Sequence, residues 1–355
     1  MNPILGVVFH AIGGFAAGSF YTPCKKIKGW AWETYWLVLG VFAWIVTPLV
    51  MAIIITPGFT RILGATPLNV IFWSYFFGVL WGIGGLTYGL TMRYLGMSLG
   101  VSVALGLCAL VGTLTPPIYE QLYGDGTKVT FFELLTTVSG RVILGGIGVC
   151  MTGIVICGKA GMMKEKELSP EEKTEGISEF HFLKGICVAT VAGVLSACFA
   201  FALKAGEKIQ EIGVDKGVQA VYSNIPLLIV ILLGGFTTNG IWCLWLGVKN
   251  KTFKNFRQID EGSMTANYLL CMTAGVLWYL QFFFYGMGTT QMGDYDFASW
   301  TLHMAFIIVT GNVIGLLTKE WKSCSSKTIL CILVGILVLI SSTIIIGYGN
   351  KLSGT

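Results

Sequence analysis

Three residues of one apolar run have the types and the spacing of a polar binding surface. Trp278, Gln281 and Tyr285 are separated by three and then four residues, so a helix would place the indole, the amide and the phenol in one column. Aromatic surface beside a hydrogen-bonding amide suits a sugar or another polyol with an apolar ring face. The alternative is that Trp278 and Tyr285 are packing residues or part of an interfacial aromatic belt.

Two histidines within apolar runs are candidates for carrying a proton. His10 lies about seven residues into the first run and His303 about six into the ninth, so at ~1.5 Å per residue both are expected roughly 10 Å below the same face. Imidazole takes up and releases a proton near neutral pH. Ionisable groups at membrane depth are costly and usually functional. The alternatives are neutral rings that hydrogen-bond a neighbour and, for His10, an anchor near the interface.

Carboxylates are scarce at membrane depth. None of the 18 acidic residues lies near the middle of an apolar run. Asp294 and Asp296 stand just before the ninth run and join His303 and His10 as candidates for proton coupling. The third histidine, His181, belongs to a charged connection and is expected to be solvated.

The other candidates for substrate contact are aromatic or amide side chains inside apolar runs: Trp81, Tyr88, Trp300 and Asn312. Asn224 is a weaker polar candidate. The ten cysteines are scattered singly, without a CxxC pair, and no phosphate-binding or zinc motif occurs. We therefore expect no metal and no cofactor, with a proton as the coupling ion.

The elements that must position these residues are membrane-spanning helices. The chain is 54% hydrophobic and 12% charged, with a mean hydropathy of +0.75, which is far more apolar than a soluble globular protein. The chain has apolar runs of about 20 residues, which is long enough to cross a bilayer. In a soluble α/β protein, polar residues would interrupt the apolar runs at shorter intervals. The sequence predicts an all-α membrane protein with ten transmembrane helices, at 3–22, 34–55, 68–92, 97–118, 141–157, 183–205, 217–246, 264–288, 297–317 and 328–348.

Charge in the connections predicts the orientation. The loops after odd-numbered helices hold 16 Lys and Arg residues, and the opposite side holds 7. The positive-inside rule therefore predicts the loops after odd-numbered helices in the cytoplasm and both termini outside. The N-terminus lacks the charged region of a signal peptide, so we expect the first helix to be retained.

The two halves of the chain resemble each other. Trp81 and Trp278 are 197 residues apart and have similar neighbours. Lys25 and Lys204 belong to a second set of matching residues, in which the members of each pair are 179 residues apart. A duplicated unit of five helices must invert in the membrane, because five is odd. We predict repeats at 1–160 and 183–355, joined by a charged cytoplasmic linker at 161–182, with Trp81 and Trp278 at related positions near mid-depth.

Several longer segments resemble one known family. They are Phe20-Tyr21-Thr22-Pro23-Cys24-Lys25-Lys26, Trp32-Glu33-Thr34, the run from Leu80 to Gly84, the run from Tyr88 to Ser98, the run from Trp278 to Tyr285, Leu302-His303-Met304 and Lys319-Glu320-Trp321. They closely resemble the L-rhamnose/proton symporter family of the drug/metabolite transporter superfamily, over nearly the whole chain. The resemblance implies a ten-helix inner-membrane transporter of two inverted repeats, which imports a 6-deoxyhexose with a proton and has both termini in the periplasm.

The chain also departs from the family pattern. Residues 119–140, 161–182 and 288–293 differ from it, so the particular deoxysugar stays open. The membrane glutamate that small multidrug exporters of the superfamily carry in their first helix is missing here, so their proton chemistry does not transfer.

Our working hypothesis is sugar/proton symport by alternating access. The sugar would stack on Trp278 or Trp81 and bond to Gln281 and His303, and protonation of His303 or Asp296 from outside would favour its binding. A proton-independent facilitator or exporter of polar metabolites is the alternative, and a membrane-embedded enzyme is a distant one. The expected partners are a small sugar and the lipid bilayer, without nucleic acid, and the oligomeric state stays open.

Overall fold

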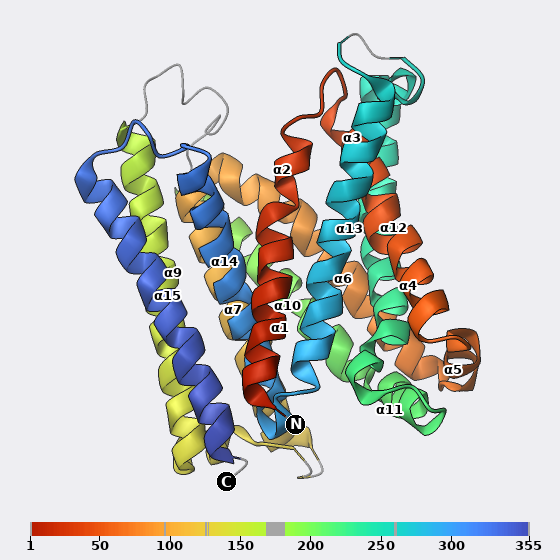
Figure 1. Cartoon of the computed structure of the whole chain (residues 1–355), viewed down its shortest axis with the longest axis vertical. Helices are drawn as coiled ribbons and strands as arrows, with labels where there is room; N and C mark the ends of the chain where they lie inside the picture. The colour runs from red at the N-terminus through yellow and green to blue at the C-terminus, as the bar shows by residue number, and fades with distance from the viewer. Residues whose placement is uncertain are drawn as a thin grey trace.

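A computed structural model describes residues 2–95, 97–124, 126, 128–167, 182–258 and 261–353. These residues form helices and no strands (Figure 1). Ten helices or joined helices among them are long and apolar enough to cross a membrane. In lipid each backbone N–H and C=O must be bonded within the chain, and a helix is how a single apolar run achieves this.

The helices begin and end as follows: α1 (Pro3–Ser19), α2 (Tyr21–Cys24), α3 (Trp32–Val41), the π-helical turn η1 (Phe42–Val46), α4 (Thr47–Ile55), α5 (Phe59–Ala65), α6 (Leu68–Leu95), α7 (Met97–Tyr123), α8 (Phe131–Thr136), α9 (Val138–Glu167), α10 (Phe182–Ala205), α11 (Glu207–Asp215), η2 (Ala220–Tyr222), α12 (Asn224–Asn250), η3 (Thr252–Phe256), α13 (Met264–Thr289), η4 (Gly293–Ala298), α14 (Ser299–Leu317) and α15 (Ser326–Ser353).

Each predicted span coincides with a helix, and the ends differ in places. Helix α9 continues to Glu167, well past the predicted end at 157 and into the predicted linker. The rest of that linker, with His181, lies outside the described residues. The short helices α5, α8 and α11 were not predicted, because each is too short or too polar to register as a span. Helix α8 begins at a capping box, in which Thr130 and Glu133 each bond the other's backbone N–H.

The two ends of the chain lie on one side of the bundle, at the bottom of Figure 1. We call this side the terminal face. The opposite side, where α2 ends and the chain passes from α14 to α15, is called the linker face. Helix α11 lies at the terminal face.

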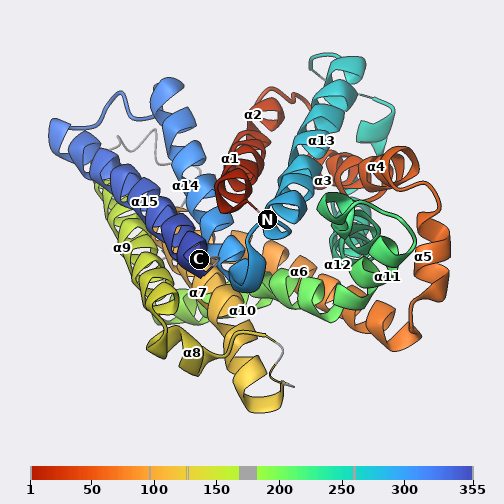
Figure 2. The ribbon, with the colours of Figure 1, turned by 60° about the horizontal axis from the view of Figure 1, so that its bottom comes forward.

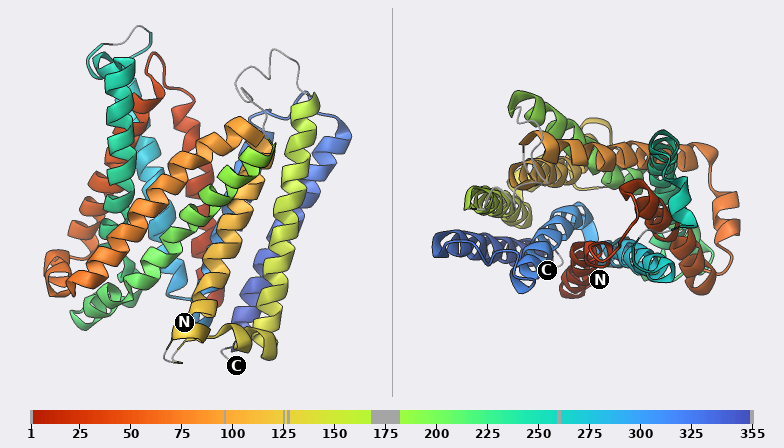
Figure 3. Two further views of the ribbon diagram at one scale, coloured as in Figure 1. Left: turned by 180° about the vertical axis from the view of Figure 1, so that it is seen from behind. Right: turned by 90° about the horizontal axis from the view of Figure 1, so that it is seen from above.

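The helices pack in a reciprocal pattern. Helix α1 lies against α13 and α14, and α10 lies against α6 and α7 (Figure 2). The first helix of each half thus packs against helices of the other half. Helices α9 and α15 run along each other at one edge, and α12 packs on α6 and α3 toward the other edge (Figure 3).

Small residues allow this close packing. A Cβ added at Gly14 of α1 would overlap the Cβ of Phe306 in α14, and one added at Gly18 would come within 2.6 Å of the Cβ of Thr310. In helix α6, Gly78 and Gly82 allow a similarly close approach to α12, but Gly85 faces open space. Close approach of backbones is how membrane helices gain packing energy.

Replacing Gly14 by leucine should destabilise the fold, because the added side chain has to push α14 away from α1. Overpacking of this kind costs about 1–3 kcal/mol. Thermal unfolding in detergent measures the effect, with Gly311→Leu as the matched control, since position 311 of α14 has no atom within 4 Å of an added Cβ. An equal fall in Tm for both variants would contradict this account of the α1–α14 contact.

Candidate functional site

Two tryptophans meet at the centre of the bundle. The rings of Trp81, near the middle of α6, and Trp278, near the middle of α13, have centroids 5.5 Å apart. The ring of Phe282 lies 5.0 Å from Trp278 and 5.6 Å from Trp81. The sequence offset of 197 residues predicted related positions near mid-depth for these residues, and the structure adds that their rings are in contact. Phe199 of α10 extends the cluster, stacked on Phe282 at 4.1 Å.

Tyr285 lies one turn beyond Phe282 and connects this aromatic cluster to both histidines. Its ring centroid is 5.3 Å from His10 of α1, 5.2 Å from His303 of α14 and 5.7 Å from Trp300 of α14. Helix α1 and the successive helices α13 and α14, which lie at the other end of the sequence, thus bring these four rings together. The shared depth predicted for His10 and His303 is confirmed by this common neighbour.

The two imidazoles are fully buried, and none of their four nitrogens has a hydrogen-bond partner in the described protein. His10 rests on Gly288, where an added Cβ would come within 2.6 Å of the ring, so only glycine fits there. An unsatisfied buried polar group costs about 1–3 kcal/mol. Such groups are unusual in a packed core and are expected where a ligand or a proton binds.

Trp300 is held rigidly in place. Its indole Nε1 donates to the carbonyl oxygen of Cys108 in α7 at 3.1 Å, and its ring stacks on Phe199 at 5.7 Å. The ring lies against Gly112, where an added Cβ would be 2.5 Å from the indole. Tyr88 of α6 lies within electrostatic reach of Cys108, so it belongs to the same neighbourhood.

A cavity of about 90 Å³ extends from this cluster to the terminal face. A cavity needs about 10–15 Å³ to hold one water molecule, so this one is large enough to admit water. Tyr285 and Trp300 form its inner end, and charged or polar side chains of α10, α11 and η4 form its outer part. Its other lining residues are Gly112, Pro116, Ala200, Leu203, Lys204, Glu207, Gln210, Asn224, Thr289, Asp296 and Phe297.

The two aspartates differ in their positions. Asp296 lines this cavity and also a second one of about 370 Å³, where Asp294 and Lys128 are neighbours. Asp294 is exposed and Asp296 is half-buried. Burial works against the charged form of Lys128, but the carboxylates of Glu207 and Asp296 outweigh it and raise the pKa of the ammonium. Lys128 thus stays cationic at neutral pH beside Asp296.

Two of the predicted residues have different surroundings from those expected. Gln281 is buried between Trp278 and Tyr285 along α13, but its amide Nε2 donates to the carbonyl of Trp278 at 2.9 Å. Asn312 donates to the carbonyl of Ile308 in its own helix at 2.8 Å. It lies nine residues beyond His303, or about 13.5 Å along the helix, so the structure does not bring it to the cluster.

Sequence reasoning missed three residues of this region. Trp44 lies in the π-helical turn η1, its ring 5.0 Å from Trp278, and its buried indole N–H has no partner among the described residues. In the sequence, the only signal for Phe199 was its match to Phe20, which lies 179 residues earlier in the other half of the chain. Glu207 lines the cavity from a helix too polar to be recognised as part of the bundle. A π-helical turn leaves no pattern that apolar run length can detect.

The arrangement combines apolar ring faces, unpaired imidazole nitrogens and the Tyr285 hydroxyl in the buried centre of the bundle. The cavity of about 90 Å³ reaches this centre from the terminal face. Such a site can hold a small molecule with an apolar ring face and hydroxyl groups, and it can exchange a proton. No cluster of three or more His, Cys, Asp or Glu side chains suited to a metal occurs among the described residues.

Known proteins match the chain over almost its full length. The profile of the L-rhamnose-proton symport protein (RhaT) family matches residues 1–351. The L-rhamnose-proton symporter of Yersinia pestis (strain Pestoides F) is 35% identical over 349 residues, which is 98% of this chain and 98% of that protein. The L-rhamnose-proton symporter of Cronobacter sakazakii (strain ATCC BAA-894) is 35% identical over 348 residues, or 97% of each chain. These relatives are named as transporters and not as enzymes. The chain therefore belongs to the L-rhamnose-proton symport protein family of multi-pass membrane proteins.

Proposed function

We propose that this protein imports L-rhamnose, or a closely related 6-deoxyhexose, together with a proton by alternating access. It would do so in the inner membrane of a bacterium, with the terminal face toward the periplasm, as a member of the drug/metabolite transporter superfamily. The observation that carries the proposal is the pair of buried imidazoles without partners, His10 and His303, around Tyr285 at the inner end of the cavity.

The site suits a deoxysugar in two respects. A pyranose presents a face of C–H groups that stacks on an aromatic ring, and Trp278 and Trp81 offer such rings beside Phe282. Its hydroxyls can bond to the imidazole nitrogens of His10 and His303. The methyl group at C6, which takes the place of a hydroxymethyl group, needs an apolar wall, and Phe199 and Phe282 provide one.

The proton shares this site with the sugar. A proton that enters from the terminal face would meet Glu207 near the mouth of the cavity and then Asp296 on its wall. His303 and His10 lie behind the inner end of the cavity, against the ring of Tyr285. When a proton and a sugar bind to one site, each changes the affinity of the other by the same factor. Sugar bound against His303 thus couples its own movement to that of the proton.

The reciprocal packing of the helices supports alternating access by two inverted repeats. Helices α1 and α10, the first of each repeat, cross to the partner repeat. Residue 14 of α1 contacts α14 and residue 193 of α10 contacts α7, as an offset of 179 requires. Rocking of one repeat against the other around Trp81 and Trp278 would open the site to each side in turn.

The proposal is tested with purified protein in liposomes that contain a pH-sensitive dye. Addition of L-rhamnose outside should acidify the lumen at a rate that follows sugar uptake. L-Mannose, which differs only by its 6-hydroxyl, should be taken up at least tenfold more slowly. Sugar uptake without a pH change, or counterflow independent of a proton gradient, would instead support the facilitator alternative.

A further inference from the structure

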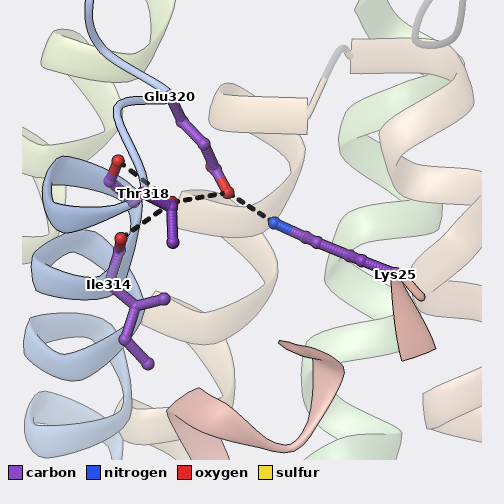
Figure 4. A network of polar contacts seen from close by, with 5 residues as sticks. Lys25, Ile314, Thr318 and Glu320 are labelled. Atoms are coloured by element: carbon purple, nitrogen blue, oxygen red, sulfur yellow. Dashed lines mark hydrogen bonds and ion pairs between the residues drawn. The ribbon is translucent and has the colours of Figure 1, made fainter. Parts of the chain in front are cut away.

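On the linker face an ion pair joins the two halves of the chain. The Lys25 ammonium at the end of α2 pairs with the Glu320 carboxylate after α14 (Figure 4). The Thr318 hydroxyl also donates to this carboxylate at 3.3 Å. Next to it, the Lys164 ammonium lies 4.6 Å from the ring centre of Trp321.

The pair is charged throughout the physiological pH range. Burial works against the Glu320 carboxylate, but the hydrogen bond and charge of Lys25 outweigh it, with help from Lys164, and lower the pKa. A lowered pKa means that the pair is lost only as pH falls through that value, which is below the usual ~4.3 of glutamate.

The repeat places an equivalent pair of residues at the terminal face. Lys204 at the end of α10 corresponds to Lys25, 179 residues earlier. Helix contacts fix the other partner: Gly14 packs on Phe306 of α14 and Gly193 packs on Leu107 of α7, so α14 and α7 correspond at an offset of 199. Glu320 corresponds within one residue to Glu120, at an offset of 200.

These terminal-face equivalents are not paired with each other. The Lys204 ammonium pairs with Glu207, three residues along, at 3.1 Å, and Glu207 also lies 3.7 Å from the Lys128 ammonium. The Glu120 carboxylate instead accepts a hydrogen bond from the backbone N–H of Gly126 at 3.2 Å.

Open space accompanies this missing contact. The cavity that leads to Tyr285 passes between Lys204 of α10 and Pro116 of α7. Another cavity, of about 580 Å³ and distinct from the two described above, is bounded by the same two residues and by Tyr119, next to Glu120. The ends of α7 and α10 at the terminal face are thus separated. The corresponding ends of α14 and α2 at the linker face are joined by the Lys25–Glu320 ion pair.

We propose that the two pairs are alternating gates: Lys25–Glu320 closes the linker face in the conformation seen here, and Lys204 exchanges Glu207 for Glu120 to close the terminal face in the other. The proposal rests on the alternating access proposed above and adds the residues that perform it. Closing the terminal face draws α7 against α10 and removes both cavities, while Glu320 releases Lys25.

The experiment measures access to the terminal-face cavity without sugar or a proton gradient. A thiol is introduced by Gln210→Cys, and its labelling by a membrane-impermeant maleimide in oriented vesicles is compared with that of the parent, whose ten native cysteines give the background. Solvent-exposed pairs contribute little, up to about 1 kcal/mol, so loss of the Lys25–Glu320 pair should change the labelling rate by about two- to fivefold.

Glu320→Gln should slow labelling at position 210, because it releases the linker face, and Glu120→Gln should keep it fast. The double exchange Lys25→Glu with Glu320→Lys should restore the parent rate. Glu261→Gln is the matched control, since Glu261 also pairs with a lysine of the other half on the same face, Lys28 at 2.9 Å, but it precedes α13 and its pair does not involve α14.

The gate assignment is overturned if Glu320→Gln labels like the parent, if Glu120→Gln slows labelling as Glu320→Gln does, or if the double exchange does not restore the rate in a protein of normal Tm. Because labelling needs no substrate, the gates can stand even if L-rhamnose is not transported, and they can fail while symport is confirmed.

Discussion

Replacing His303 by alanine should abolish sugar-dependent proton uptake and weaken sugar binding by about 5- to 100-fold. The binding loss corresponds to about 1–3 kcal/mol for a hydrogen bond removed from a buried site. The physical reason is that both nitrogens of His303 are buried without a protein partner, 5.2 Å in ring distance from Tyr285, so the ligand is the group that can satisfy them.

A second substitution separates binding from coupling. His303→Gln keeps hydrogen-bonding capacity but does not titrate, so it should retain sugar binding within about tenfold while losing the proton flux. Asn312→Ala is the control on the same helix, because Asn312 bonds only to the Ile308 carbonyl of its own helix. Binding is measured by calorimetry at two pH values and coupling by the liposome assay.

Full coupling in His303→Ala would remove this residue from the proton path. The same measurement on His10→Ala and Asp296→Asn would then identify the carrier, since His10 packs against Tyr285 at the inner end of the cavity and Asp296 lines its wall. A loss of coupling in Asn312→Ala as large as that in His303→Ala would show that the assay reports general damage to α14.

The number of helices and the depth of the candidate residues were predictable from the sequence. An apolar run of about 20 residues has one stable form in lipid, so composition alone defines ten spans. The helical rise then fixes depth, which is why a shared depth could be predicted for His10 and His303, whereas the sequence left open whether they meet. The offset between Trp81 and Trp278 predicted related positions near mid-depth, and the structure adds that the two rings are in contact.

Lateral order and helix rotation were not predictable. Hydropathy does not say that α1 inserts between α13 and α14, since lipid and protein interiors are similarly apolar. The surroundings of Asn312 and of the Gln281 amide depend on that rotation. The spacing that put Gln281 in the aromatic column was right, but its Nε2 donates to the Trp278 carbonyl. Trp44 faces the cluster through a π-helical turn that leaves no periodic pattern.

Trp278→Ala should weaken sugar binding by about 10- to 100-fold, which is about 1.4–2.8 kcal/mol, and should do so more than Trp81→Ala. Trp278 contacts Trp81, Phe282 and Trp44, so it forms the centre of the ring surface. Deleting a buried tryptophan also costs about 3–5 kcal/mol of stability, and a fall in binding could then report only a damaged fold.

Two variants distinguish these causes. Trp278→Phe keeps a ring face and most of the packing, so sugar binding should fall less than tenfold and Tm should change little. Trp44→Phe removes a similar volume from the neighbouring ring, 5.0 Å from Trp278 and outside the cavity lining, and should leave binding unchanged. If binding instead follows Tm across all four variants, the rings are only packing residues. If Trp81→Ala alone weakens binding at unchanged Tm, the sugar stacks on the first repeat, and the roles assigned to the two equivalent tryptophans must be exchanged.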